Sequence, residues 1–117
     1  MRLVIAALFL SLCSLQLSAQ SMPEITCKSV GVASCAAPMG FCLEFIQYEG
    51  ADPEYWENMC QSMEGVFSEA PCDSSATVLT CVNKNNPMMP IWRFTSQMEG
   101  QAAQMMCTSM GATVCPR

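Results

Sequence analysis

The sequence predicts an α+β fold: a small disulfide-stapled domain with two main helices and a small antiparallel sheet, built from imperfect Cys-rich repeats. Three observations support this class. Eight cysteines follow an apolar leader, two helix-length segments end in "CQSMEG" (60–65) and "CTSMG" (107–111), and short stretches rich in branched and aromatic residues lie between them. An even number of cysteines in a short exported chain is typical of a disulfide framework.

The first 19 residues have the layout of a secretory signal peptide, in which a basic residue precedes an apolar run. Arg2 comes before "LVIAALFLSL" (3–12), and cleavage is predicted after Ala19, with Ser21 as the alternative. A membrane-spanning helix needs about 20 apolar residues, so no membrane span is predicted. Lipidation at Cys13 is a competing interpretation, although Leu12 is not the small residue that a lipoprotein signal has before its cysteine. The predicted location is secreted or periplasmic.

The remaining residues, 20–117, are predicted to form a single disulfide-rich domain, because a chain of this length suits one core. The full chain has a net charge of −5, and loss of Arg2 with the leader leaves −6. An acidic chain with few, scattered cations repels nucleic acid and anionic lipid surfaces, so neither is expected as a partner.

Cysteine is the residue type on which the predicted stability depends. Eight cysteines follow the leader, and all are predicted to be paired in an oxidising compartment: Cys27, Cys35, Cys42, Cys60, Cys72, Cys81, Cys107 and Cys115. Eight cysteines allow 105 pairings, and the sequence does not select one. Zinc is the alternative, but the chain has no histidine and no Cys-x-x-Cys pair, so no metal is expected.

The cysteine spacing suggests three repeat units, about 22–48, 49–95 and 96–117. Each contains a version of one motif: "CKSVG" (27–31), "CQSMEG" (60–65) and "CTSMG" (107–111). The arrangement resembles tandem Cys-rich repeats of exported bacterial proteins, a group without an assigned activity. The resemblance implies no catalytic residue.

The two clearest helices are predicted at about 53–64 and 97–110. In the first, Asp52 is placed to cap the free amides and Pro53 suits the first helical position. In the second, Ser96 and Glu99 form a Ser-x-x-Glu capping box. Each helix has five apolar residues at matching offsets from its cysteine: Tyr55, Trp56, Met59, Cys60 and Met63, and Ala102, Ala103, Met106, Cys107 and Met110. Gly65 and Gly111 are expected to end the helices in the left-handed conformation.

Strands are predicted where branched and aromatic residues alternate with polar ones. The clearest are 41–48, and 77–82 with 91–95, which we expect to form a hairpin. Shorter ones follow each motif at 32–35, 66–72 and 112–115.

Carboxylates are the only acid–base groups left for catalysis, since the chain lacks histidine and its cysteines are predicted to be bonded. Glu49, Asp52, Glu54 and Glu57 lie near one another in sequence, but nothing in their spacing shows a catalytic pair, so they are interpreted as a solvated acidic face with charges near a helix start. A small secreted carboxylate-dependent hydrolase is therefore the alternative function.

Ten methionines follow the leader, and most are interpreted as flexible core side chains. Copper(I) is the competing interpretation, because thioethers are soft ligands. The loop 83–92 is the predicted contact surface, with Met88, Met89 and Trp92 as the partner-binding residues, unless Trp92 turns into the core. We expect a secreted, non-catalytic binding or interaction module for an unknown protein or small ligand, with no cofactor; a toxin or inhibitor would be a special case.

Overall fold

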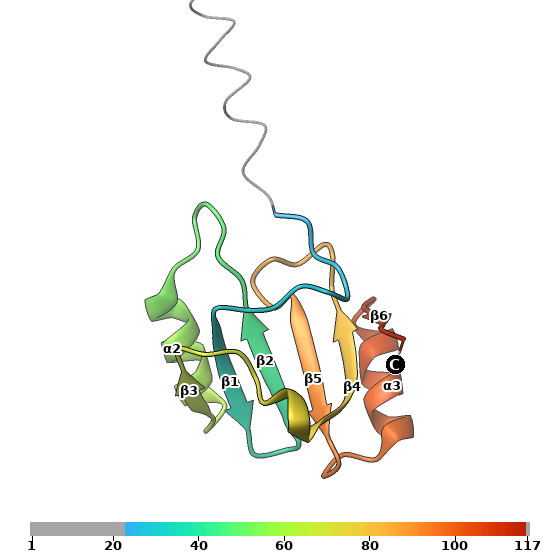
Figure 1. The fold of residues 1–117 in the computed structure, drawn as a ribbon. Helices are drawn as coiled ribbons and strands as arrows, with labels where there is room; N and C mark the ends of the chain where they lie inside the picture. The colour runs from blue at the N-terminus through green and yellow to red at the C-terminus, as the bar shows by residue number, and fades with distance from the viewer. Residues whose placement is uncertain (1–22, 117) are drawn as a thin grey trace, which may run out of the picture.

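A six-stranded antiparallel sheet carries two helices on one face (Figure 1). This computed structural model describes residues 23–116, so the predicted signal peptide, 1–19, lies outside the described residues. The α+β class with two main helices, an antiparallel sheet and four disulfides is confirmed.

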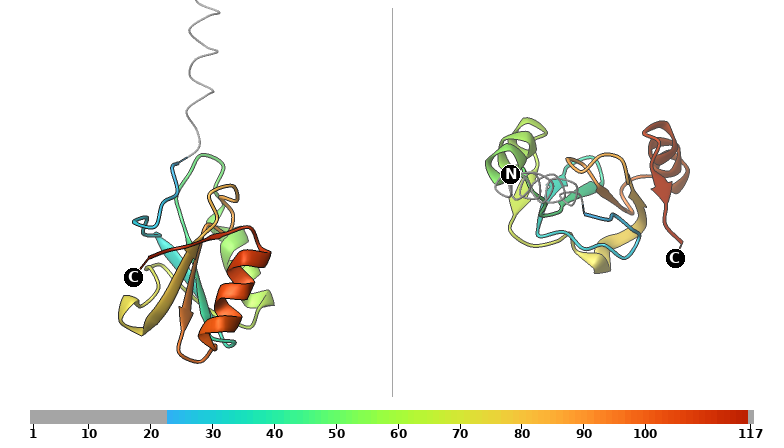
Figure 2. Two further views of the ribbon diagram at one scale, coloured as in Figure 1. Left: turned by 90° about the vertical axis from the view of Figure 1, so that its right-hand side faces the viewer. Right: turned by 90° about the horizontal axis from the view of Figure 1, so that it is seen from above.

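The elements follow one another as β1 (Ala33–Ala37), β2 (Phe41–Phe45), α2 (Pro53–Ser62), β3 (Val66–Ser68), the 3-10 turn η1 (Ser74–Ala76), β4 (Thr77–Val82), β5 (Ile91–Thr95), α3 (Gly100–Ser109) and β6 (Thr113–Val114). In the sheet the strands take the order β3-β1-β2-β5-β4-β6. Figure 2 shows both helices on the same side of the curved sheet, one near each edge. The predicted hairpin 77–82 with 91–95 is present with the expected bounds.

The elements divide into two halves of the same topology, β1-β2-α2-β3 and β4-β5-α3-β6. Cys35 of β1 pairs in register with Leu43 of β2, and Cys81 of β4 pairs with Trp92 of β5. Leu43 and Trp92 are themselves partners where β2 meets β5. An approximate two-fold axis therefore passes between these two residues, and the halves lie side by side across it (Figure 1).

The three-unit repeat expected from the sequence gains no support from this arrangement. The described part of the first unit, residues 23–48, contains β1 and β2 but no helix, so it has no counterpart of α2 or α3. The motif "CKSVG" precedes β1, whereas the other two motifs form the ends of helices. The cysteine, serine and glycine that the motifs share therefore occupy different structural positions in the first motif and in the other two.

The helix-bearing face of the sheet forms the main core. Side chains alternate along a strand, so every second residue of β2 and β5 points to this face. Leu43, Phe45 and Phe94 are fully buried there, and Trp56 of α2 stacks on Phe45 with ring centroids 5.1 Å apart. Methionines from both helices fill the space around them, as predicted: Met59, Met63, Met106 and Met110 are partly buried against this cluster.

The opposite face has a smaller core beneath the N-terminal segment. Ile25 from that segment packs with Ile46, Val82 and Ile91, which come from the other set of alternating positions. The segment 23–32 therefore covers part of the sheet that the helices leave open.

Four disulfides join the elements: Cys27–Cys115, Cys35–Cys60, Cys42–Cys72 and Cys81–Cys107. All eight cysteines predicted to pair do so. Two bonds are equivalent in the two halves, since Cys35–Cys60 joins β1 to α2 and Cys81–Cys107 joins β4 to α3. Each helix is thus bonded to the strand beneath it.

The helix starts were predicted with unequal success. The Asp52 carboxylate accepts a hydrogen bond from the Glu54 amide at 3.0 Å, so the first cap is confirmed. The predicted capping box at Ser96 and Glu99 is wrong, because α3 begins at Gly100 and Glu99 makes no side-chain cap. The chain first turns at 95–98, where the Met98 amide donates to the Thr95 carbonyl, and this turn delays the helix.

The helix ends were also predicted correctly in one half and wrongly in the other. Gly111 has the expected left-handed backbone (φ 71°), but in the first half Glu64 takes that conformation (φ 58°), so the expectation for Gly65 is wrong. Gly65 is needed for a different reason. A Cβ at this position would lie 2.5 Å from the Cys35 sulfur and 3.0 Å from the Cys60 sulfur, so only glycine lets the chain pass this disulfide.

Candidate functional site

The three residues predicted to bind a partner lie close together, but they are not equally exposed. Met88 lies in the β4–β5 loop and is 42% exposed. Met89 is half-buried, and Trp92 lies in β5 rather than in the loop. The Trp92 ring packs on Phe41 with centroids 5.3 Å apart, and its indole N–H donates to the Met89 carbonyl. Trp92 therefore packs largely against the core, which was the alternative to a partner-binding role for this residue.

The loop itself is braced by its own polar residues. Asn83 and Asn86 side chains accept hydrogen bonds from the Asn85 and Met88 amides, respectively. Such Asx turns fix a loop locally. The Asn83 amide donates to the carbonyl of the buried Pro90 and closes the hairpin. Met88 is consequently held in a defined position at the surface.

One carboxylate that was not predicted as a site residue is fully buried. Glu44 of β2 is 1% exposed and points to the face opposite the helices. It forms an ion pair with Arg93 of β5, whose Nη2 lies 3.0 Å from Oε2. The amides of Gly31 and Cys72 also donate to it, at 2.9 and 3.0 Å. Both oxygens are thus occupied.

This ion pair joins five separate segments. Arg93 also donates to the Thr80 hydroxyl and to the Ser29 carbonyl, so the N-terminal segment, β2, β4, β5 and the loop after β3 all meet here. Gly31 is required for close approach, because a Cβ would lie 2.8 Å from the Glu44 Cβ. A carboxylate bound on all sides is a structural group and offers no oxygen to a substrate. A Glu and an Arg within otherwise apolar strands, "FCLEF" and "IWRFT", are the signal that could have revealed it.

Asp73 is the carboxylate with a shifted acidity. Hydrogen bonds from the Ser75 hydroxyl, and then from the Ser75 amide, hold the pKa of Asp73 below its ordinary value of 3.8. The group begins the turn η1 and is exposed. Its role is local, since it fixes the entry of the chain into β4.

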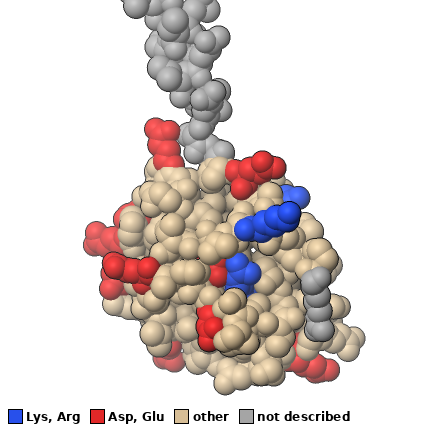
Figure 3. Space-filling view, in the orientation of Figure 1, with Lys and Arg blue, Asp and Glu red and all other residues tan. Residues whose placement is uncertain are grey.

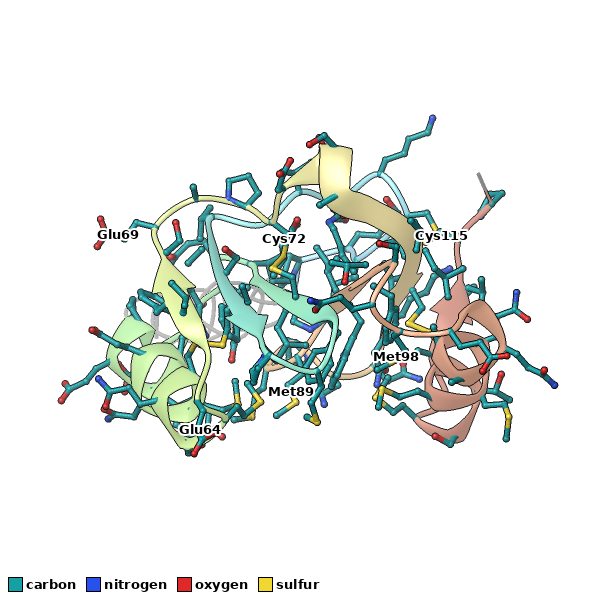
Figure 4. The ribbon with its side chains drawn as sticks, turned by 90° about the horizontal axis from the view of Figure 1, so that it is seen from below. Glu64, Glu69, Cys72, Met89, Met98 and Cys115 are labelled. Carbon is teal, nitrogen blue, oxygen red and sulfur yellow. A yellow bond between two sulfur atoms is a disulfide. The ribbon has the colours of Figure 1, made fainter. Side chains whose placement is uncertain are left out.

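A pocket of about 370 Å³ lies between the start of α2 and the β1–β3 edge of the sheet. Its walls include the apolar side chains of Val32, Trp56 and Phe67. Three exposed carboxylates also line it: Glu54, Glu57 and Glu69. Two come from α2 and the third follows β3, where Figure 4 shows Glu69 pointing outward on the same side of the molecule as α2. Glu54 and Glu57 are close in sequence, whereas Glu69 reaches them only through the fold.

This pocket differs from two other hollows on the surface of the described residues. One, of about 470 Å³, is lined by five residues of a single helix, α3, and is an open helix surface. Another, of about 170 Å³, runs beside β4 from Thr77 to Thr80 next to Cys115 and Pro116. The pocket at α2 combines residues from two strands and a helix with both apolar and charged groups, which is typical of ligand sites.

Two further observations limit the chemistry of the described residues. Within residues 23–116, no group of three or more His, Cys, Asp or Glu side chains is placed to hold a metal ion. In the same part of the chain, no helix is long and apolar enough to cross a membrane. Four disulfides indicate an oxidising environment, extracellular or periplasmic.

Comparison with known proteins adds no relative. No family model, no curated protein and no solved structure matches the chain.

Proposed function

We propose that the protein is an exported, non-catalytic binding module whose ligand occupies the pocket between α2 and the β1–β3 edge. The pocket itself is the observation that supports this proposal, because its lining combines apolar side chains with three exposed carboxylates. The charge of the lining comes from Glu54 and Glu57 on α2 and from Glu69 after β3.

The pocket has rigid walls. The Cys35–Cys60 bond fixes α2 to β1, and Trp56 is 3% exposed and stacked on Phe45. The Cys42–Cys72 bond holds the chain just after Glu69. A site that is already shaped loses less entropy on binding, so such bracing favours a binding role.

The exposed Met88 at the β4–β5 loop is the second surface that we consider. Large apolar side chains in fixed positions serve as contacts for partners, and the loop's own hydrogen bonds hold this one in place. The loop has less apolar surface to offer than its sequence suggests, because Trp92 packs on Phe41.

The test is a ligand screen followed by backbone and side-chain NMR shifts of the mature protein. The library contains small neutral, anionic and cationic molecules in equal number. We expect the shifted signals to gather at Val32, Trp56, Phe67 and their neighbours, whatever the charge of the molecule that binds. Shifts confined to the β4–β5 loop would move the binding site there. A screen without any shifts at the pocket or at the β4–β5 loop would contradict a binding role for both surfaces. Hydrolysis of a glycan or peptide during the screen would instead support the alternative function, a hydrolase.

A further inference from the structure

The pocket at α2 lies at the end of an open sheet edge, and the two features point to one kind of ligand. β3 is the last strand of the sheet on this side, and among residues 23–116 it pairs only with β1. The outer backbone groups of an edge strand are free to pair with another extended chain. Phe67 belongs to β3 and Glu69 follows it by two residues, so both alternate onto the side of the pocket.

The charge of the pocket is not balanced by its own residues. None of its lining residues is a lysine or arginine. Among the described cations, Arg93 is bound to Glu44, and Lys28 and Lys84 belong to other segments. Figure 3 shows red carboxylates along the left edge, where Figure 1 places α2 and β3, with the blue groups nearer the centre and upper right.

The helix dipole does not account for all three carboxylates. Glu54 is in the first turn of α2, where a negative charge is stabilised by the free amides. Glu57 is one turn further on, and Glu69 comes from a different element. A pocket lined by apolar side chains and by exposed carboxylates without a basic partner in its lining complements a side chain that has an apolar stem and a cationic head.

From the edge and the pocket together, we infer that the protein binds an extended basic segment of a partner protein. The segment pairs with the outer edge of β3, and one lysine or arginine side chain enters the pocket toward Glu54, Glu57 and Glu69. Strand addition of this kind derives affinity from backbone hydrogen bonds and selectivity from pockets for alternate side chains. This inference rests on the proposed function, since it names the ligand class of the same pocket.

The test compares three five-residue peptides with blocked ends. The first has arginine between two valines and flanking threonines, the second has neutral citrulline in place of arginine, and the third has the arginine sequence with N-methylated backbone amides. Free butylguanidinium is the small-molecule probe. Affinity is measured by calorimetry at low salt, and the contact surface is mapped by the NMR shifts of the backbone amides from Val66 to Glu69.

We expect the arginine peptide to bind about tenfold more tightly than the citrulline peptide and to shift the β3 amides. The preference should shrink as salt screens the carboxylates. The triple variant Glu54→Gln, Glu57→Gln and Glu69→Gln should lose the preference, and the matched control Glu99→Gln, whose carboxylate precedes α3, should keep it.

Each other outcome overturns the inference in a distinct way. Equal binding of the citrulline peptide would show that the pocket does not select a cationic head group, although the pocket would remain a binding site. Equal binding of butylguanidinium, or of the N-methylated peptide, would show that backbone pairing with β3 does not contribute to affinity. The pocket would then be a site for a small cation and not for an extended chain. If none of these probes binds but neutral or anionic library molecules still shift the pocket signals, the inference fails and the proposed function stands. If no molecule of any charge reaches the pocket, both fail.

Discussion

Glu64 adopts a backbone conformation that costs free energy for any residue with a side chain. Its φ of 58° is left-handed, and the equivalent position in the second half is Gly111, with a φ of 71°. The left-handed region costs an L-residue roughly 1–2 kcal/mol, and glycine avoids this cost but loses more entropy on folding. The equivalent helix ends of the two halves therefore differ, because glycine suits the left-handed conformation and glutamate does not.

The first prediction follows from this inequality. Glu64→Gly should raise the free energy of unfolding by about 0.5–1 kcal/mol, because the strain is relieved. Urea unfolding with the disulfides intact measures the change. Gly111→Ala is the matched control and should lower the free energy of unfolding. A lower stability for Glu64→Gly would mean that the Glu64 side chain contributes more than its backbone costs.

The buried ion pair gives the second prediction. Glu44→Gln should lower the free energy of unfolding by about 3–5 kcal/mol, because Arg93 and two backbone amides lose a charged acceptor in a dry environment. Thermal and urea unfolding measure the loss. Glu49→Gln removes an exposed carboxylate nearby in sequence and should change stability little. Equal, small effects of both substitutions would show that the pair at Glu44 is not a stability determinant.

At the scale of elements, the two halves place the same bond between strand and helix. Cys35–Cys60 and Cys81–Cys107 close sequence separations of 25 and 26 residues, and all four cysteines are fully buried. Loop-closure entropy then predicts a similar stabilisation from each bond, about 3–4 kcal/mol.

The third prediction is that the double variants Cys35→Ala/Cys60→Ala and Cys81→Ala/Cys107→Ala lose comparable stability. Differential scanning calorimetry of each, with the remaining three bonds confirmed by mass, is the measurement. A much larger loss in one variant would show that the matching topology does not make the halves energetically equivalent.

The elements themselves could be predicted to different degrees, for physical reasons. The hairpin 77–82 with 91–95 and most of the helix faces around Cys60 and Cys107 were predicted because their patterns are local, but Tyr55 and Ala102, which were assigned to those faces, are exposed. The pairing of the halves was not predicted, since Cys35 and Cys81 are equivalent through position in the sheet, with little sequence around them in common. The predicted division into three units depended on the motif at Cys27. Its residues match those of the other two motifs, but its structural position does not.

The candidate site was less predictable than the fold. The exposure of Met88 follows from a polar loop, but the partial burial of Trp92 depends on strand alternation and on Phe41, which lies 51 residues earlier. The pocket needs Glu69 beside Glu54 and Glu57, and only the crossover from α2 to the sheet edge brings them together. Long-range pairing of this kind leaves no local pattern.

At the scale of the whole molecule, the approximate two-fold axis explains why the ion pair requires unlike halves. Counting from Leu43 and Trp92, which are equivalent, Glu44 corresponds to Arg93. Two identical halves would bring like charges together at this buried position, where one carboxylate or guanidinium would repel the other. The pair is therefore possible only because the halves differ at this residue.

The bond between Cys27 and Cys115 has a consequence for how the protein withstands proteases. It joins the two ends of the described domain, whose Cα atoms lie 5.6 Å apart at this point, and the other three bonds fall inside the ring that it closes. Any single backbone cut between residues 27 and 115 leaves every fragment attached. A nick in the exposed part of the β4–β5 loop would thus add the mass of one water without releasing a piece. The nicked molecule should separate into two fragments only after reduction.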